Sequence, residues 1–127
     1  MNNRPFLQPK MTEAVLNLGK NLIAAEPYVR YQKAEKVLNA DDTARGLLNN
    51  LVQTQAWVRK AQTNGTITAE DLQTLSDLQR QVQENPIITD YTTCQQEMIK
   101  FLQQINGEIS QLLGINFALI ARRSSCC

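Results

Sequence analysis

Residues 85–113 read NPIITDYTTCQQEMIKFLQQINGEISQLL and contain the most regular pattern in the chain. Eight positions follow one another at alternating intervals of three and four residues: Ile88, Tyr91, Gln95, Met98, Leu102, Ile105, Ile109 and Leu112. This spacing is a heptad seam, which predicts a long α-helix with an apolar stripe. Asn85 is the expected N-cap and Pro86 the expected first residue, and the helix is predicted to continue to about Ala121.

Such a helix predicts self-association. From Pro86 to Ala121 it would measure roughly 54 Å, whereas a compact domain of this chain length is roughly 36 Å across. The overhanging stripe would need a second subunit to cover it, so we expect a homodimer. Bends at Asn106-Gly107 or Gly114 would shorten the overhang. The expected self-association residues are Met98, Leu102, Ile105, Ile109 and Leu112.

The remaining chain divides into shorter helices at its helix-breaking residues. Thr12 is a plausible cap for a first helix, with Val15, Leu18 and Leu22 on its apolar face. Pro27 suits the start of a second helix, and Asn64-Gly65 the end of a third. The segment Thr68–Asp71 has the spacing of a capping box for a fourth. These signals predict an all-α fold, an antiparallel bundle of about five helices whose last helix is long. The predicted organisation is an N-terminal arm over 1–11, one helical domain over 12–121 and a cysteine-containing tail over 122–127.

Composition narrows the function. The 127 residues include 13 Lys+Arg, 12 Asp+Glu and no histidine. Without histidine, Ser-His-Asp and Cys-His nucleophile systems are excluded. The acidic pairs Asp41-Asp42 and Glu70-Asp71 stand at expected helix starts, where they complement the helix dipole. We therefore predict no catalytic residue, no small-molecule substrate and no enzyme. The longest apolar run is too short to cross a bilayer, and Met1–Pro5 does not form a signal peptide, so a cytoplasmic protein without membrane insertion is expected.

Three parts of the chain together resemble the YlbF/YmcA-like family. The front part runs from Pro27 through Tyr31 to Leu47-Leu48. The middle part contains Gly65, Asn85-Pro86-Ile87 and Tyr91. The end contains Asn106–Ser110, Leu113–Ala118 and the final Cys126-Cys127, and it is the most specific of the three. The resemblance extends from about Thr12 to Cys127.

This resemblance implies a bacterial, non-enzymatic, helical regulator that acts through protein contacts. Members of the family form homo-oligomers or associate with related YlbF/YmcA-like subunits. Some belong to a complex that promotes competence, biofilm formation and sporulation and that assists a membrane-associated endoribonuclease in mRNA processing. Some carry iron–sulfur clusters on cysteines. This chain ends at its cysteine pair, where relatives continue into a longer Cys- and Gly-rich tail.

The cysteine pair suggests an alternative role as an iron–sulfur redox sensor. Arg122-Arg123 would favour the thiolates of Cys126 and Cys127, but a cluster usually takes four thiolates and one tail supplies two. Cys94 would lie about 40 Å from Ala121 along an unbroken helix, beyond the tail's reach of about 20 Å. A cluster would then be shared between two tails or completed by a partner. A frayed end with spare thiols, a redox disulfide and lipidation remain alternative readings. Cys94 itself is expected to be a buried thiol beside the seam.

Two further features have a functional and a structural reading. The segment containing Arg30, Lys33 and Lys36 is a possible RNA or partner contact, which would make the chain an RNA-contacting accessory subunit. In the structural reading its tyrosines pack inward and its charges are solvated. The net charge of +1 favours the structural reading, and direct nucleic-acid binding is not expected. Trp57 is expected in the core or at an interface rather than as a ligand platform.

Overall fold

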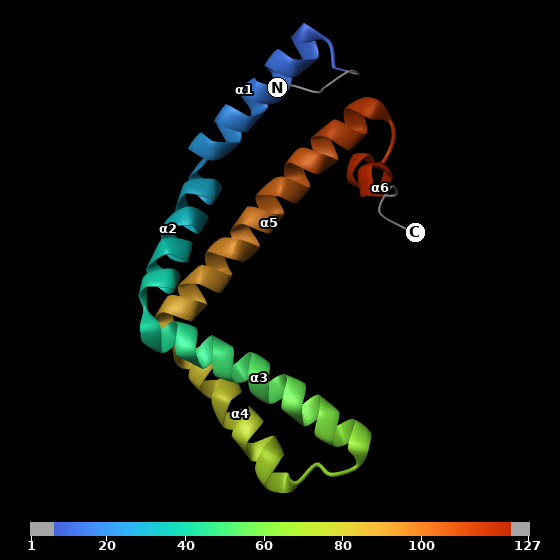
Figure 1. Ribbon diagram of the computed structural model, residues 1–127. Coiled ribbons are helices and arrows are strands. Elements are labelled where there is room, and N and C mark those ends of the chain that lie inside the picture. The colour runs from blue at the N-terminus through green and yellow to red at the C-terminus, as the bar shows by residue number, and fades with distance from the viewer. Residues whose placement is uncertain (1–6, 123–127) are drawn as a thin grey trace.

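The computed structural model describes residues 7–122, and within that range the chain is helical without a β-strand (Figure 1). This confirms the all-α prediction. The elements in chain order are α1 (Pro9–Ala24), α2 (Glu26–Ala40), α3 (Asp42–Asn64), α4 (Ala69–Glu84), α5 (Pro86–Leu113) and the short α6 (Phe117–Arg122).

The helices form two arms that meet at one junction (Figure 1). In the first arm, α5 packs antiparallel along α2, while α1 prolongs α2 and is not packed along α5. In the second arm, α3 and α4 form an antiparallel hairpin. The short α6 turns back beside the distal end of α5. The fold is therefore two antiparallel helix pairs joined end to end, and its arms expose more surface than one closed bundle would.

The junction combines helix capping with the main core. Single extended residues, Asp41 and Asn85, separate α2 from α3 and α4 from α5. The Asp41 carboxylate accepts a 2.8 Å hydrogen bond from the backbone N–H of Ala44. Ala44 is fully buried in a cluster with Leu38 and Ile88. Because the caps set the chain direction at the point where apolar residues meet, each cap also positions a core residue.

The α3–α4 connection follows the predicted turn chemistry. Gly65 ends α3 in the left-handed region at φ 70°, which glycine adopts without a Cβ clash. The Thr68 hydroxyl accepts from the Asp71 backbone N–H at 3.1 Å, and the Asp71 carboxylate accepts from the Thr68 backbone N–H at 3.0 Å. This is the expected capping box, so the start of α4 is confirmed.

Two helix ends differ from the prediction. The first helix begins at Pro9 rather than after Thr12, since proline at N1 already has a helical φ and has no N–H to satisfy. The last long helix ends at Leu113, not near Ala121, because Gly114 takes φ 71° and reverses the chain. Its length is thus about 42 Å rather than 54 Å.

The first helix also corrects the predicted core. Val15 is 48% exposed and Leu18 is likewise exposed, although both belong to the apolar face that we expected to point inward. No other helix within residues 7–122 packs along that face. The chain exposes 10101 Å², whereas a compact monomer of this mass exposes about 6,800 Å². The first helix therefore has the predicted apolar face, but the single chain does not bury the residues of that face.

Candidate interaction surfaces

The predicted seam of α5 is only partly covered within the chain. Met98, Ile105 and Ile109 are half-buried, whereas Leu102 is exposed and Leu112 is 85% exposed. Helix α2 packs along α5 near the junction, whereas α1 does not pack along the distal part of α5 (Figure 1). All five predicted residues lie on one helix, and the structure leaves two of them open to solvent.

Residues on α1 and α6 extend the uncovered apolar area at the same end of the molecule (Figure 1). We define the distal apolar surface as the exposed large apolar residues of α1, distal α5 and α6. Its members are Met11, Val15, Leu16, Leu18, Ile23, Leu102, Leu112, Leu113, Phe117, Leu119 and Ile120. The sequence analysis did not predict that the α1 residues are exposed, because periodicity identifies the apolar face of a helix but does not show which element covers it.

Polar residues in the C-terminal stretch that resembles the family hold α6 in place through hydrogen bonds. The Ser110 hydroxyl accepts a 3.0 Å hydrogen bond from the backbone N–H of Phe117. The Asn106 side chain accepts a 3.1 Å hydrogen bond from the backbone N–H of Ala118. Asn116 caps the same helix through the N–H of Leu119 at 3.1 Å. These bonds satisfy N–H groups that the start of a helix leaves unpaired, and they fix the apolar residues of α6 against α5.

The basic segment of α2 is partly neutralised. The Arg30 guanidinium pairs with the Glu97 carboxylate of α5, and both side chains remain substantially exposed. Lys33 and Lys36 are exposed on α2. Arg30 and Lys33 line one small cavity, but Asp90 lines it as well. The three cations predicted as an RNA or partner contact thus lie along one helix, with carboxylates of α5 beside them.

Beside this segment, Tyr31 of α2 packs against Tyr91 of α5 with ring centroids 5.6 Å apart. Their hydroxyl groups share a hydrogen bond of 3.1 Å. The hydrogen bond shared with Tyr91 and then burial raise the pKa of Tyr31 to about 12. Tyr31 therefore packs against α5, as the structural reading of this segment expected for that tyrosine.

The cysteines separate into one described residue and two that lie outside the described range. Cys94 is 3% exposed, which confirms the expected buried thiol. Burial and then the Asp90 carboxylate raise the pKa of the Cys94 thiol, so the thiolate that binds metals is disfavoured. Within residues 7–122 no group of three or more potential ligands is placed to hold a metal ion. Cys126 and Cys127, the predicted cluster ligands, lie outside the described residues.

The chain reversal at Gly114 changes the expected separation of Cys94 and Ala121. The helix breaks at Gly114, so the 40 Å separation that assumed an unbroken helix to Ala121 does not apply. Burial of the thiol, rather than distance, now argues against Cys94 as a ligand. The described part of the chain consequently does not form a cluster site on its own.

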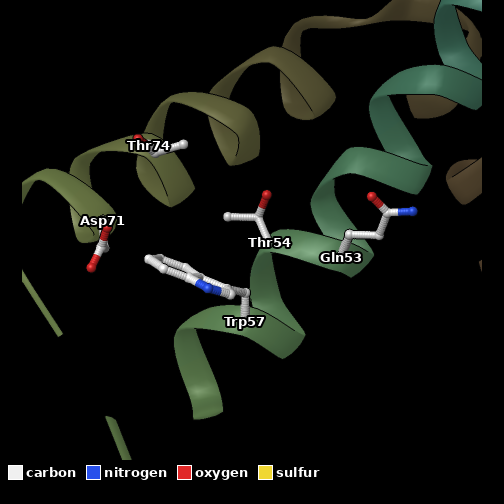
Figure 2. Close-up of a pocket in the computed structure, with 5 residues that line it drawn as sticks. All are labelled: Gln53, Thr54, Trp57, Asp71 and Thr74. Carbon is white, nitrogen blue, oxygen red and sulfur yellow. The ribbon is translucent and has the colours of Figure 1, made fainter. Parts of the chain in front are cut away.

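Trp57 lies on the α3–α4 hairpin and is not in the core. Its side chain is 54% exposed and lines an open cavity of about 420 Å³, which we call the Trp57 cavity. The other lining residues are Gln53, Thr54, Asp71 and Thr74. Figure 2 shows the indole extending from α3 toward Asp71 of α4, with Thr54 between the helices. The core reading of Trp57 is therefore wrong for the single chain. The sequence contained one indication of this position: Gln53 and Trp57 are four residues apart, so they share one face of α3, and Gln53 is polar.

Two antiparallel helix pairs with large apolar residues exposed on each of the six described helices define an all-helical fold suited to contacts between proteins. The family model for "Control of competence regulator ComK, YlbF/YmcA" matches residues 11–113. The chain belongs to this YlbF/YmcA family, as the resemblance predicted, and thus to a family of competence regulators. No helix within residues 7–122 has both the length and the hydropathy to cross a bilayer.

A solved structure supports the fold. The chain is similar to a chain in the crystal structure of Bacillus subtilis RicA in complex with RicF, with a TM-score of 0.73 and 16% sequence identity. The alignment covers 83% of this chain and 94% of the other. At this identity the similarity establishes the fold alone. No protein with a curated description matches the chain.

Proposed function

We propose that this protein is a non-enzymatic regulatory adaptor of the bacterial cytoplasm that self-associates and binds other proteins. The observation that carries this proposal is the distal apolar surface, which no part of the described chain covers. The excess of exposed area over a compact monomer is roughly 3,000 Å², and obligate dimers bury about 1,000–2,500 Å² on each partner. A second copy of the chain could therefore cover the surface.

Family membership supports a proposal about the pathway. YlbF-type regulators support competence, biofilm formation and sporulation and assist an endoribonuclease in mRNA processing, and we assign the same kind of role to this chain. The RicA structure contains a second protein, RicF, which supports contacts with related subunits as an alternative to self-association. Either assembly would use apolar helix faces, because contacts of this kind release the most free energy when apolar area is buried.

The test replaces two seam residues that are exposed in the single chain, Leu102→Glu and Leu112→Glu together. Because both side chains already face water, the monomer should keep its helicity. Light scattering after size exclusion should show a dimer for the wild type and a monomer for the variant. The matched control, Gln103→Glu with Gln104→Glu, adds the same charge at exposed positions outside the predicted seam and should remain dimeric.

A wild-type monomer at high concentration would contradict self-association. An intact dimer in the Leu102→Glu/Leu112→Glu variant would remove this seam from the interface. Circular dichroism on every variant separates loss of assembly from loss of folding.

A second candidate is an iron–sulfur redox sensor, favoured by the adjacent thiols of Cys126 and Cys127. One chain supplies two thiolates there, so the cluster would be shared between subunits or completed by a partner. Iron and sulfide assays on anaerobically purified protein test this, beside a Cys126→Ser/Cys127→Ser variant. Iron that disappears in the variant supports a cluster, and a colourless, iron-free wild type contradicts one held by this protein alone.

The RNA-contacting alternative is favoured by the alignment of Arg30, Lys33 and Lys36 along α2. Such binding must weaken steeply with salt, since it depends on phosphate contacts and counterion release. Mobility shifts with single-stranded RNA at low salt should be lost on Lys33→Glu/Lys36→Glu if this face binds RNA. Absence of a shift at low salt would exclude it, and the carboxylates beside the segment favour that outcome.

A further inference from the structure

The tryptophan of the α3–α4 hairpin has no structural role that explains its position. Trp57 is the single tryptophan of the chain, and more than half of its side chain faces solvent. Leaving an indole in water forgoes the free energy that burial would release. Tryptophan is also among the residues most enriched at the energetic centres of protein interfaces. The exposed indole beside a cavity therefore marks a second contact surface, on the arm opposite the distal apolar surface (Figure 1).

The wall of the Trp57 cavity that α4 supplies carries one carboxylate, Asp71, beside Thr74. Helix α4 carries Glu70 and Asp71 in its first turn and no basic residue there. Its one arginine, Arg80, pairs with Asp77 at 3.8 Å and with Glu84 at 3.7 Å. Within the described residues, no ion pair therefore neutralises the two carboxylates at the start of the helix. Lys60 follows Trp57 by one helical turn but does not line the cavity.

The polar groups at the cavity have unused acceptor capacity. One Asp71 oxygen, Oδ2, accepts the capping hydrogen bond from Thr68, and Oδ1 is the second oxygen of the same carboxylate. Thr54 lines the cavity between the indole and α4 (Figure 2). An apolar side chain placed there would desolvate these groups without pairing them, which is costly. The cavity therefore suits a cation with a flat face.

We propose that the Trp57 cavity binds an arginine side chain of a partner protein. The guanidinium stacks on the indole of Trp57 and donates to Asp71 Oδ1, a combination that lysine cannot match because its ammonium is not planar. This inference rests on the proposed adaptor function and names the chemistry of one of its partners. The Trp57 cavity is separate from the seam, so the arginine site and self-association through the seam can be tested and refuted independently.

The test uses the full chain, with Trp57 emission as a reporter because no other tryptophan contributes. The probe is the peptide acetyl-Gly-Ser-Arg-Ser-Gly-amide, compared with the same peptide carrying citrulline, which keeps the shape of arginine but has no charge. We expect a saturable emission change with the arginine peptide and at least about tenfold weaker binding of the citrulline peptide. Added salt should weaken only the arginine peptide.

A charge variant locates the site. Asp71→Asn keeps an oxygen for the Thr68 capping bond while it removes the charge, so the helix start is preserved and arginine-peptide binding should fall about tenfold. The control Asp77→Asn removes a carboxylate from the same helix outside the cavity and should bind as the wild type does. Circular dichroism confirms that both variants fold.

Three results would overturn the inference. They are equal binding of the arginine and citrulline peptides, no saturable response up to about 10 mM peptide, and Trp57 emission that shifts when the protein alone is diluted. The last result would mean that a second copy of the chain covers the cavity. A failed peptide titration on a protein that is dimeric by light scattering rejects the arginine site and leaves the adaptor function standing.

Discussion

Tyr31 and Tyr91 share a hydrogen bond of 3.1 Å between their hydroxyl groups and tie α2 to α5. The bond crosses the arm between residues sixty positions apart, next to the Arg30–Glu97 ion pair. It therefore fixes the register of α5, the helix that presents the seam, against α2. Contacts of this kind link the stability of the fold directly to the geometry of the interaction surface.

Removing one hydroxyl of this pair should be measurable. Tyr91→Phe keeps the packed ring and deletes the hydrogen bond, so we expect a loss of about 1 kcal/mol in the free energy of unfolding. Urea unfolding followed by circular dichroism measures it. Tyr28→Phe, which loses an exposed contact with Gln32 instead, is the matched control and should change stability by less. Equal losses in the two variants would contradict a specific role for the pair.

The tyrosine pair also predicts a pH dependence. Folding raises the pKa of Tyr31 from 10.0 to about 12, so the folded state holds this proton more tightly than the unfolded state. The stabilisation is complete below pH 10 and is lost as the pH rises toward 12. Urea midpoints across this range should fall with pH, and Tyr91→Phe should reduce the slope. A slope unchanged in the variant would assign the effect to other groups.

The cap at Asn85 should matter because it starts the longest helix. Its side-chain oxygen accepts from the backbone N–H groups of Ile87 at 3.0 Å and Ile88 at 3.1 Å. Asn85→Ala should cost about 1 kcal/mol in unfolding free energy. Asn85→Asp keeps the acceptor and adds a charge that the helix dipole favours, so it should restore stability. Calorimetry compares them, and an alanine variant as stable as the aspartate variant would refute the capping role.

Two glycines at α3 should respond to alanine in opposite directions. Gly65 has φ 70°, which a Cβ disfavours, so Gly65→Ala should destabilise by about 1 kcal/mol. Gly46 lies inside α3 with no atom within 4 Å of an added Cβ, so Gly46→Ala should stabilise by about 0.5–1 kcal/mol. Thermal unfolding of both variants provides the check. A shift of the same sign in both would show that backbone conformation does not decide the outcome.

Thiol chemistry should separate Cys94 from the other cysteines. In a Cys126→Ser/Cys127→Ser variant, Cys94 is the remaining thiol, and its burial and raised pKa predict slow labelling by a thiol reagent at neutral pH. Denaturant should make one thiol react quickly. Fast labelling in the native variant would mean that α2 and α5 open readily around Cys94.

The helical class, the helix order and most of the caps could be predicted from the sequence, because periodicity and capping are local properties. Asn85-Pro86, Thr68–Asp71 and Gly65 each mark a helix end through bonds to residues a few positions away. The start of α1 at Pro9 and the end of α5 were the exceptions. The sequence marked Gly114 as a possible bend. That α5 ends there is supported by contacts distant in sequence, in which Asn106 and Ser110 of α5 accept hydrogen bonds from backbone N–H groups of α6.

Only the tertiary structure determined which apolar residues are covered. Val15 and Leu112 have the same periodic signal as Leu38, but Leu38 meets Ala44 and Ile88 at the junction, whereas Val15 and Leu112 remain 48% and 85% exposed. Periodicity reports which face of a helix is apolar, whereas burial depends on where the other helices go. For the same reason Trp57, expected in the core or at an interface, lies open beside Asp71, since that neighbour comes from a helix whose placement no local pattern specifies.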